Sequence, residues 1–143
     1  MKEYLLLDRK YWKVVLHPDQ YYLGRSVIVS KTNHEHLSQF SPNEIKELFE
    51  VIKDLEEGMQ KAFDVTHFNW TCFNNDSYKE ENKDKERKLH LHLRPRYSHP
   101  VLLQGYTFLD RNFGYHYERR TDEQVSDEIM TYITESIKKE ILN

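Results

Sequence analysis

Two histidines alternate with leucines in the stretch "KLHLHLRPRY", residues 88–97. Successive side chains of a β-strand point to opposite faces, so the pattern predicts a strand with its leucines on one face. The other face would then carry Lys88, His90, His92 and Arg94, with neighbours about 6.5–7 Å apart. We expect the leucines to attach this strand to a core and the polar face to meet ligand or solvent.

The polar face of this strand has the groups that phosphoryl transfer needs. A neutral imidazole nitrogen near pH 7 is a nucleophile that can attack phosphorus, and it is a good leaving group from the resulting phosphoramidate. Adjacent cations bind phosphate oxygens, stabilise charge in the transition state and disfavour protonation of the imidazoles. The pattern therefore predicts nucleotidyl or phosphoryl transfer through a covalent histidine.

Two other interpretations fit the same pair. His90 and His92 could lie on an exposed strand face without function, because an H-x-H pair arises readily by chance in a chain with eight histidines. They could also bind a metal ion, but a metal site needs further ligands, and the sequence offers no carboxylate at the usual short offset after the pair. We expect no metal and no cofactor.

The length indicates a single domain, residues 1–143. A chain of this size can bury enough surface to fold without stabilising disulfides or metal ions. The lone Cys72 excludes an internal disulfide and four-cysteine zinc sites, and it suits a reducing cytoplasm. The net charge of −3 does not favour a stable nucleic-acid partner. The apolar run at residues 4–7 is too short for a signal peptide or a membrane span. We therefore expect a cytoplasmic protein without a membrane partner.

The patterns before and after the histidine strand indicate further strands. Residues 12–16, "WKVVL", and 26–30, "SVIVS", flank a segment with turn residues and predict an antiparallel hairpin with a long connection. Residues 66–73 are rich in aromatic and β-branched side chains and predict another strand. A short strand is expected at residues 101–103. The charged segment 76–87 has no periodicity and predicts a loop.

Two helices complete the expected α+β domain with its antiparallel sheet. Ser41 as N-cap, Pro42 in the first turn and Glu44 in a capping box predict the start of a long helix. Its apolar side chains continue at helical spacing to about residue 63. A second helix is expected from about residue 122 to 142, where apolar residues recur every four positions.

The histidine stretch resembles the signature of the histidine triad (HIT) family, in the branch that continues into "PRY". With Pro95, Arg96 and Tyr97 as the anchor, His90 falls on the family's middle histidine and His92 on its third. The segments "WKVVLHPDQYYLGRSVIVS", "FNWTCFNND" and "GYTFLDRNFGYHY" resemble other parts of that branch in the same order. The resemblance extends over residues 12–117. It implies a HIT-like α+β fold, in which an antiparallel sheet of about five strands accompanies one long central helix and a C-terminal helix.

By this resemblance the protein is a homodimer and binds a nucleotide substrate. HIT enzymes attack the α-phosphorus of a nucleoside phosphoramidate or dinucleoside polyphosphate with the middle histidine. Water then hydrolyses the nucleotidyl-histidine, or another acceptor takes the nucleotide. The resemblance therefore implies that His90 is the nucleophile, and that His92 hydrogen-bonds phosphate oxygens and assists the leaving group.

The resemblance also implies substrate-binding residues. Asn75, with Asn74 as second choice, matches the asparagine that reaches the phosphate or leaving group, and His17 matches the polar residue that contacts the ribose. Arg94 and Arg96 could bind phosphate or could be solvated. The segment "NFGYHYERR" could cover the neighbouring subunit's site in a dimer, or pack on its own subunit.

Lys88 is a departure from the family, because it stands where the first histidine of the triad is expected. A charged lysine can donate a hydrogen bond to a carbonyl or phosphate but cannot accept one. We therefore expect slower turnover or a preference for highly charged polyphosphates. The alternative is a non-catalytic nucleotide-binding module with a degenerate triad.

Overall fold

A computed structural model describes residues 2–142, and it contains seven strands, two α-helices and three short 3-10 turns. Within that range, no helix is both long enough and apolar enough to cross a membrane. The strands are β1 (Leu5–Asp8), β2 (Trp12–Leu16), β3 (Ser26–Ser30), β4 (His67–Thr71), β5 (His90–Arg96), β6 (Val101–Leu103) and β7 (Tyr106–Phe108). The helices are α1 (Pro42–Phe63) and α2 (Asp127–Leu142), and the 3-10 turns are Leu37–Gln39, Asn75–Tyr78 and Glu80–Asn82.

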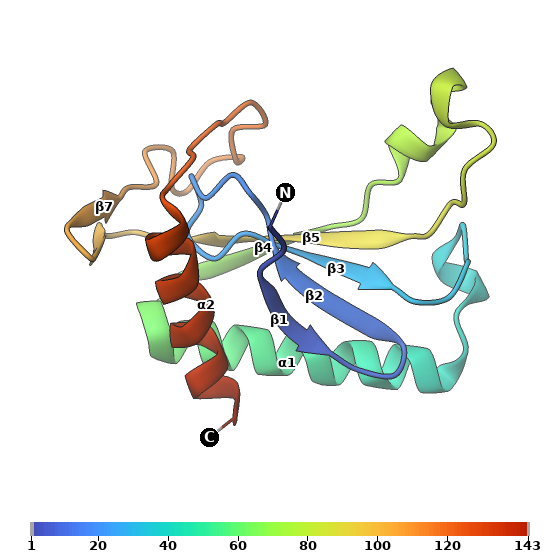
Figure 1. Cartoon of the computed structure of the whole chain (residues 1–143), viewed down its shortest axis with the longest axis horizontal. Helices are drawn as coiled ribbons and strands as arrows, with labels where there is room; N and C mark the ends of the chain where they lie inside the picture. The colour runs from blue at the N-terminus through green and yellow to red at the C-terminus, as the bar shows by residue number, and fades with distance from the viewer. Residues whose placement is uncertain (1, 143) are drawn as a thin grey trace.

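Five strands form one antiparallel sheet in the order β1-β2-β3-β5-β4. Helix α1 runs beneath this sheet, and α2 lies beside it at one end (Figure 1). The face opposite α1 carries irregular segments at both ends: the loop between β4 and β5, and the segment between β7 and α2 (Figure 1). The fold is α+β, as predicted from the sequence.

The core lies between the sheet and the helices, and β2 and β3 alternate buried and half-buried side chains. Leu89 and Leu93 are buried in the same cluster as Leu55 and Met59 of α1. Helix α2 packs so closely on α1 that Gly58 has no room for a side chain: a Cβ there would stand only 2.8 Å from Ile141. The leucines therefore attach β5 to the core, and its histidines are turned to the opposite face.

A capping box fixes the start of α1. The Ser41 hydroxyl accepts a hydrogen bond from the Glu44 backbone at 3.2 Å, and the Glu44 carboxylate accepts one from the Ser41 backbone at 3.0 Å. The Glu44 carboxylate also accepts from the Thr32 hydroxyl, which ties the helix to the end of β3. Burial raises the pKa of Glu44, but the hydrogen bonds from Thr32 and Ser41 outweigh it and lower the pKa to about 2.

The second helix begins at Asp127, so the expected start near residue 122 was wrong. The backbone of Glu123 is already occupied: its N–H donates to the Asp19 carboxylate at 2.9 Å, and its carbonyl accepts from the Gln20 backbone at 3.0 Å. An N–H in a first turn has no helical partner in any case, but a carbonyl directed at a distant loop does not accept from the residue four positions on, as a helical carbonyl would.

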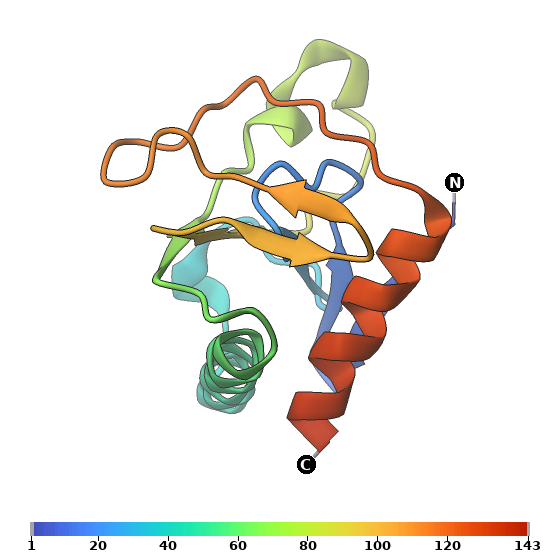
Figure 2. The same ribbon diagram turned by 90° about the vertical axis from the view of Figure 1, so that its left-hand side faces the viewer.

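Two further differences concern strands. The sequence patterns missed β1, whose four residues pair with β2 across an irregular register. They indicated one short strand at 101–103, whereas the chain forms a separate two-stranded hairpin, β6–β7, near the end of the sheet where α2 lies (Figure 2). An edge strand pairs with only one neighbouring strand, so its formation depends on that partner. A segment of four residues is also too short to show a clear strand pattern in the sequence.

Replacing the carboxylate of the capping box should destabilise the protein. We expect Glu44→Gln to lower the free energy of unfolding by about 1–2 kcal/mol, because it removes charge-assisted acceptors at the helix start. The stabilisation should be complete above the ordinary carboxyl pKa of 4.5 and be lost as the pH falls toward 2, because the folded-state pKa is depressed. Urea unfolding at several pH values measures both effects.

Glu50→Gln is the matched control, since Glu50 is an exposed residue of the same helix. An equal loss in both variants, or a difference that does not shrink in acid, would contradict this account of Glu44.

Candidate active site

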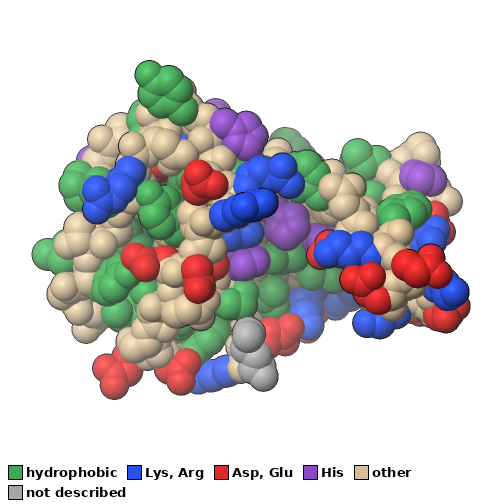
Figure 3. Space-filling view, turned by 90° about the horizontal axis from the view of Figure 1, so that it is seen from above, with side chains coloured by type: hydrophobic (Ala, Val, Ile, Leu, Met, Phe, Trp, Pro, Cys, Tyr) green, Lys and Arg blue, Asp and Glu red, His purple; other side chains and the backbone are tan. Residues whose placement is uncertain are grey.

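His90 and His92 lie side by side on the face of the sheet that points away from α1. Their ring centroids are 5.0 Å apart, and the rings are inclined at 71°. Their cross-strand neighbours are Val29 and Val27 on β3, with Thr71 on β4 also opposite His92. Seen from above this face, histidine side chains and side chains of Lys or Arg gather near its middle, between a broad and a narrower lobe (Figure 3).

A cavity of about 150 Å³ opens at the two histidines. Phe73, Asn75 and Asp76, which follow β4, line one part of it. Arg119 lines another part and belongs to the segment between β7 and α2, residues 109–126, which we call the tail segment. Three separate stretches of the chain therefore meet around one pair of imidazoles.

His92 is held in its neutral form. Burial, together with the neighbouring His90, Arg94 and Arg25, lowers the pKa of His92 to about 4. Its Nδ1 atom is buried and has no hydrogen-bond partner among residues 2–142. Because Nδ1 is buried, a ligand can meet this neutral imidazole only at Nε2, which donates or accepts according to the tautomer.

His17, the expected ribose contact, lies just after β2 and near this site but does not line the cavity. Its Nδ1 accepts a hydrogen bond from the Asp19 backbone at 3.0 Å. Burial, together with Arg25 and Arg94, lowers the pKa of His17 to about 4. The ring is therefore neutral with its proton on Nε2, which can donate to a hydroxyl.

Arg94 is buried beneath the tail segment. Its side chain stacks on the Tyr117 ring, with the guanidinium carbon 4.0 Å from the ring centroid. Its Nε and Nη1 atoms have no hydrogen-bond partner within the described residues. The residue lies next to the histidine pair on β5, yet it does not line their cavity.

Arg96 binds the tail segment rather than solvent. Its guanidinium donates to both carboxylate oxygens of Asp110, at 2.6 and 3.2 Å, and to Asn69 at 2.9 Å. It also donates to the backbone carbonyls of Tyr115 and Asn112, both at 3.0 Å. These bonds use all five N–H groups of the guanidinium, so Arg96 has no donor left for phosphate.

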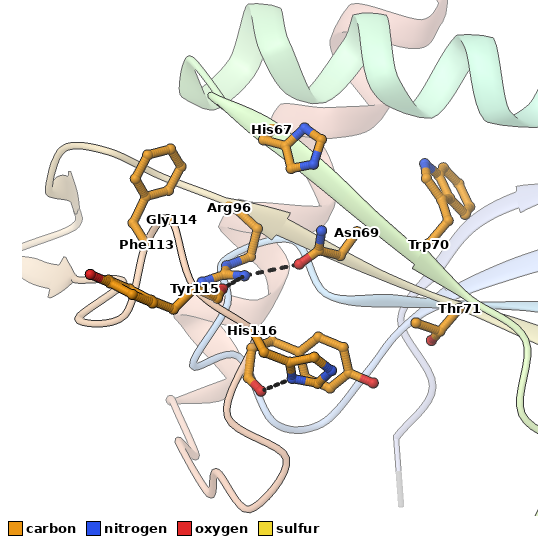
Figure 4. A pocket seen from close by; sticks show the side chains of 10 residues that line it. His67, Asn69, Trp70, Thr71, Arg96, Phe113, Gly114, Tyr115 and His116 are labelled. Atoms are coloured by element: carbon orange, nitrogen blue, oxygen red, sulfur yellow. Dashed lines mark hydrogen bonds between the residues drawn. The ribbon is translucent and has the colours of Figure 1, made fainter.

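A larger cavity of about 430 Å³ lies beside Arg96 (Figure 4). It is bounded by β4 and the tail segment, and its lining residues are His67, Asn69, Trp70, Thr71, Arg96, Phe113, Gly114, Tyr115, His116 and Tyr117. We place the candidate active site at the smaller cavity, because the adjacent imidazoles lie there and the arginine of the larger one is fully bonded.

Of the remaining predicted residues Asn74, Asn75 and Lys88, only one lines this cavity. Asn75 lines it, whereas Asn74 does not, although the buried Asn74 Nδ2 has no partner within residues 2–142. Lys88 precedes β5, is exposed and pairs with Glu86 at 3.4 Å. It lies two residues before β5 begins and does not line the cavity.

Sequence reasoning missed three lining residues: Phe73, Asp76 and Arg119. Phe73 and Asp76 flank the predicted Asn75, and an exposed aromatic directly after a strand was a usable signal. Arg119 was not singled out, although the resemblance had indicated that the segment "NFGYHYERR", which contains it, could cover a neighbouring subunit's site. The tail segment covers the site of its own chain.

A metal site is not formed within residues 2–142, since no three His, Cys, Asp or Glu side chains there stand close enough to hold an ion.

No family model matches the sequence, and no curated protein matches it. Solved structures do match. A hypothetical histidine triad nucleotide-binding protein from Sulfolobus tokodaii aligns over 100% of this chain and 86% of its own, with a TM-score of 0.70 and 15% identity. A histidine triad protein from Sinorhizobium meliloti aligns over 96% and 89%, with a TM-score of 0.72 and 14% identity.

The Plasmodium falciparum diadenosine triphosphate hydrolase aligns over 97% of this chain and 76% of its own, with a TM-score of 0.62 and 16% identity. These likenesses extend over nearly the whole chain. The protein therefore has the histidine triad fold, as the resemblance of its motifs indicated.

Removing the arginine that binds the tail segment should destabilise the protein. We expect Arg96→Gln to lower the free energy of unfolding by about 3 kcal/mol, because it leaves the buried Asp110 carboxylate without its counter-charge. Backbone amides of residues 110–123 should also exchange faster with deuterium. Arg111→Gln, an exposed change in the same segment, is the control. Equal exchange in the two variants would show that Arg96 does not hold the segment.

Proposed function

We propose that the protein is a nucleotide hydrolase or nucleotidyltransferase that acts at the α-phosphorus of a nucleoside phosphoramidate or dinucleoside polyphosphate. The observation that carries this proposal is the pair of adjacent imidazoles in a cavity that also holds Asn75 and a cation. The match to a diadenosine triphosphate hydrolase supports the same class of reaction.

His90 is the proposed nucleophile because its tautomer suits the task. Its Nδ1 lies 3.4 Å from the Lys88 carbonyl, and only a protonated Nδ1 can donate to that oxygen. The lone pair is then on Nε2. Attack by Nε2 forms a nitrogen–phosphorus bond while the bond from phosphorus to the leaving group breaks. Water, or another acceptor, then displaces the nucleotide and restores His90.

His92 and Asn75 are proposed to assist this displacement. A neutral His92 donates its N–H to a phosphate oxygen or delivers that proton to the leaving group. The Asn75 amide supplies a further donor at the cavity wall. His17 is proposed to hydrogen-bond the ribose through Nε2, and the buried Arg94 to act on the phosphate through its charge.

A non-catalytic nucleotide-binding module is the second candidate. It is favoured by the position of Lys88, which points to Glu86 and leaves the triad without a third member in the cavity. Such a protein would bind nucleoside monophosphate at the same residues without covalent chemistry.

Replacing the proposed nucleophile tests the reaction. We expect wild-type protein to release nucleoside monophosphate from diadenosine triphosphate or adenosine phosphoramidate, and His90→Ala to lose at least about a thousandfold in kcat/KM. Mass spectrometry after brief exposure should find one nucleotide on the peptide that contains His90. His36→Ala, a change at an exposed position that does not line the cavity, is the control.

The result also separates the two candidates. Unchanged turnover in His90→Ala would exclude His90 as the nucleophile. A wild-type protein that gains thermal stability with nucleoside monophosphate, yet shows neither turnover nor a modified histidine, would be the binding module.

We also propose that the protein is a homodimer joined through β4 and α1. Strand β4 is at the edge of the sheet, and open edges pair readily with a second copy about a two-fold axis. Beside it, α1 exposes Phe49, which is 64% accessible, at a hollow that Glu56 also lines. The Glu56 carboxylate accepts from Trp70 of β4 at 2.8 Å, so this patch around Phe49 and the open edge are contiguous.

A charge on this patch should therefore dissociate the dimer. We expect light scattering to give the dimer mass for wild type and the monomer mass for Phe49→Glu, because the interface would bury an unpaired carboxylate. Leu102→Glu, a control at a position 68% exposed on β6, should stay dimeric. A monomeric wild type at micromolar concentration would contradict the proposal.

A further inference from the structure

Three arginines from three parts of the chain surround the histidine pair. Arg25 follows the connection between β2 and β3, Arg94 lies on β5, and Arg119 belongs to the tail segment. Arg25 and Arg94 both lower the pKa of His92, and Arg119 acts on Arg94 in the same sense. The three guanidinium groups are therefore electrostatic neighbours.

Arg25 and Arg94 are buried cations without full compensation. They are only 8% and 7% exposed, and Arg25 Nε and two nitrogens of Arg94 have no partner within residues 2–142. Burying a guanidinium without pairing its N–H groups is costly, so such groups are retained where an anion is to be bound.

Among residues 2–142, the carboxylate that pairs with the buried members of this cluster is Asp19, and its oxygens are already occupied. Asp19 Oδ2 accepts from Arg25 at 3.0 Å and from the Thr121 hydroxyl. Asp19 Oδ1 accepts from the backbone of Tyr21 at 3.0 Å and of Glu123 at 2.9 Å. Two buried guanidinium groups against one carboxylate leave a net positive charge beneath the site.

Arg119 is the member of the cluster that a ligand can reach. It is exposed and lines the same cavity as His90 and His92. The one carboxylate lining that cavity, Asp76, is exposed and pairs with Lys79 at 3.0 Å. The Arg119 fork is therefore available to an incoming anion, and a guanidinium binds phosphate through two parallel hydrogen bonds.

We propose that Arg119 contacts the phosphates beyond the one that His90 attacks, and that Arg25 and Arg94 add fixed positive charge beneath it. This inference rests on the proposed function and names the residue that selects an anionic leaving group. A substrate with a phosphate chain gains the Arg119 contact, whereas a phosphoramidate with an uncharged leaving group does not. The tail segment is thus part of the substrate site of its own chain.

Binding of AMP and ATP to protein carrying His90→Ala, which prevents turnover, tests this assignment. Isothermal titration calorimetry in EDTA should show ATP binding more tightly than AMP. Adding Arg119→Ala should weaken ATP binding about tenfold and leave AMP binding within about twofold, because the lost contact is to the outer phosphates. Arg119→Lys keeps the charge but not the fork, so it should fall between the two.

Arg111→Ala is the matched control, since Arg111 is exposed in the same segment and lines none of the cavities described above. It should leave both affinities unchanged. Equal losses for AMP and ATP in Arg119→Ala, or no loss for either, would overturn the assignment of Arg119. Absence of binding of either nucleotide to wild-type protein would instead overturn the proposed function.

Discussion

The buried bidentate ion pair between Arg96 and Asp110 is the interaction on which the arrangement of the site depends. Arg96 shares the outward face of β5 with His90 and His92, so one strand carries both the candidate chemistry and the anchor for the tail segment. With that segment fixed, Tyr117 stacks on Arg94 and Arg119 reaches the histidine cavity. A bidentate pair between buried partners gives the defined geometry that this positioning requires.

The charges around the histidines help to keep the imidazoles neutral, at the expense of stability. Two buried guanidinium groups with unpaired N–H atoms are costly, but the same groups help keep His92 and His17 neutral. A neutral imidazole can donate to phosphate oxygens and assist a leaving group at physiological pH. The positive field also favours an anionic substrate before any direct contact is made.

The sequence predicted much of the fold, because the fold depends on local periodicity. The strands β2, β3 and β5, the alternation within β5 and the Ser41–Glu44 capping box were predicted from the sequence. The start of α2 was misplaced because Asp19 and Gln20, distant in sequence, occupy the Glu123 backbone. Lys88 was placed on the histidine face by extending the alternation two residues before the strand begins.

By itself the sequence determined that two imidazoles stand on one side of a leucine-anchored strand, since side-chain alternation is a property of the extended backbone. Only the tertiary structure decided what surrounds them. It turned Arg96 into an anchor, buried Arg94 beneath Tyr117 and brought Arg119 to the cavity. These contacts join residues far apart in the chain, and hydrogen bonds and burial at such separations leave no local pattern to read.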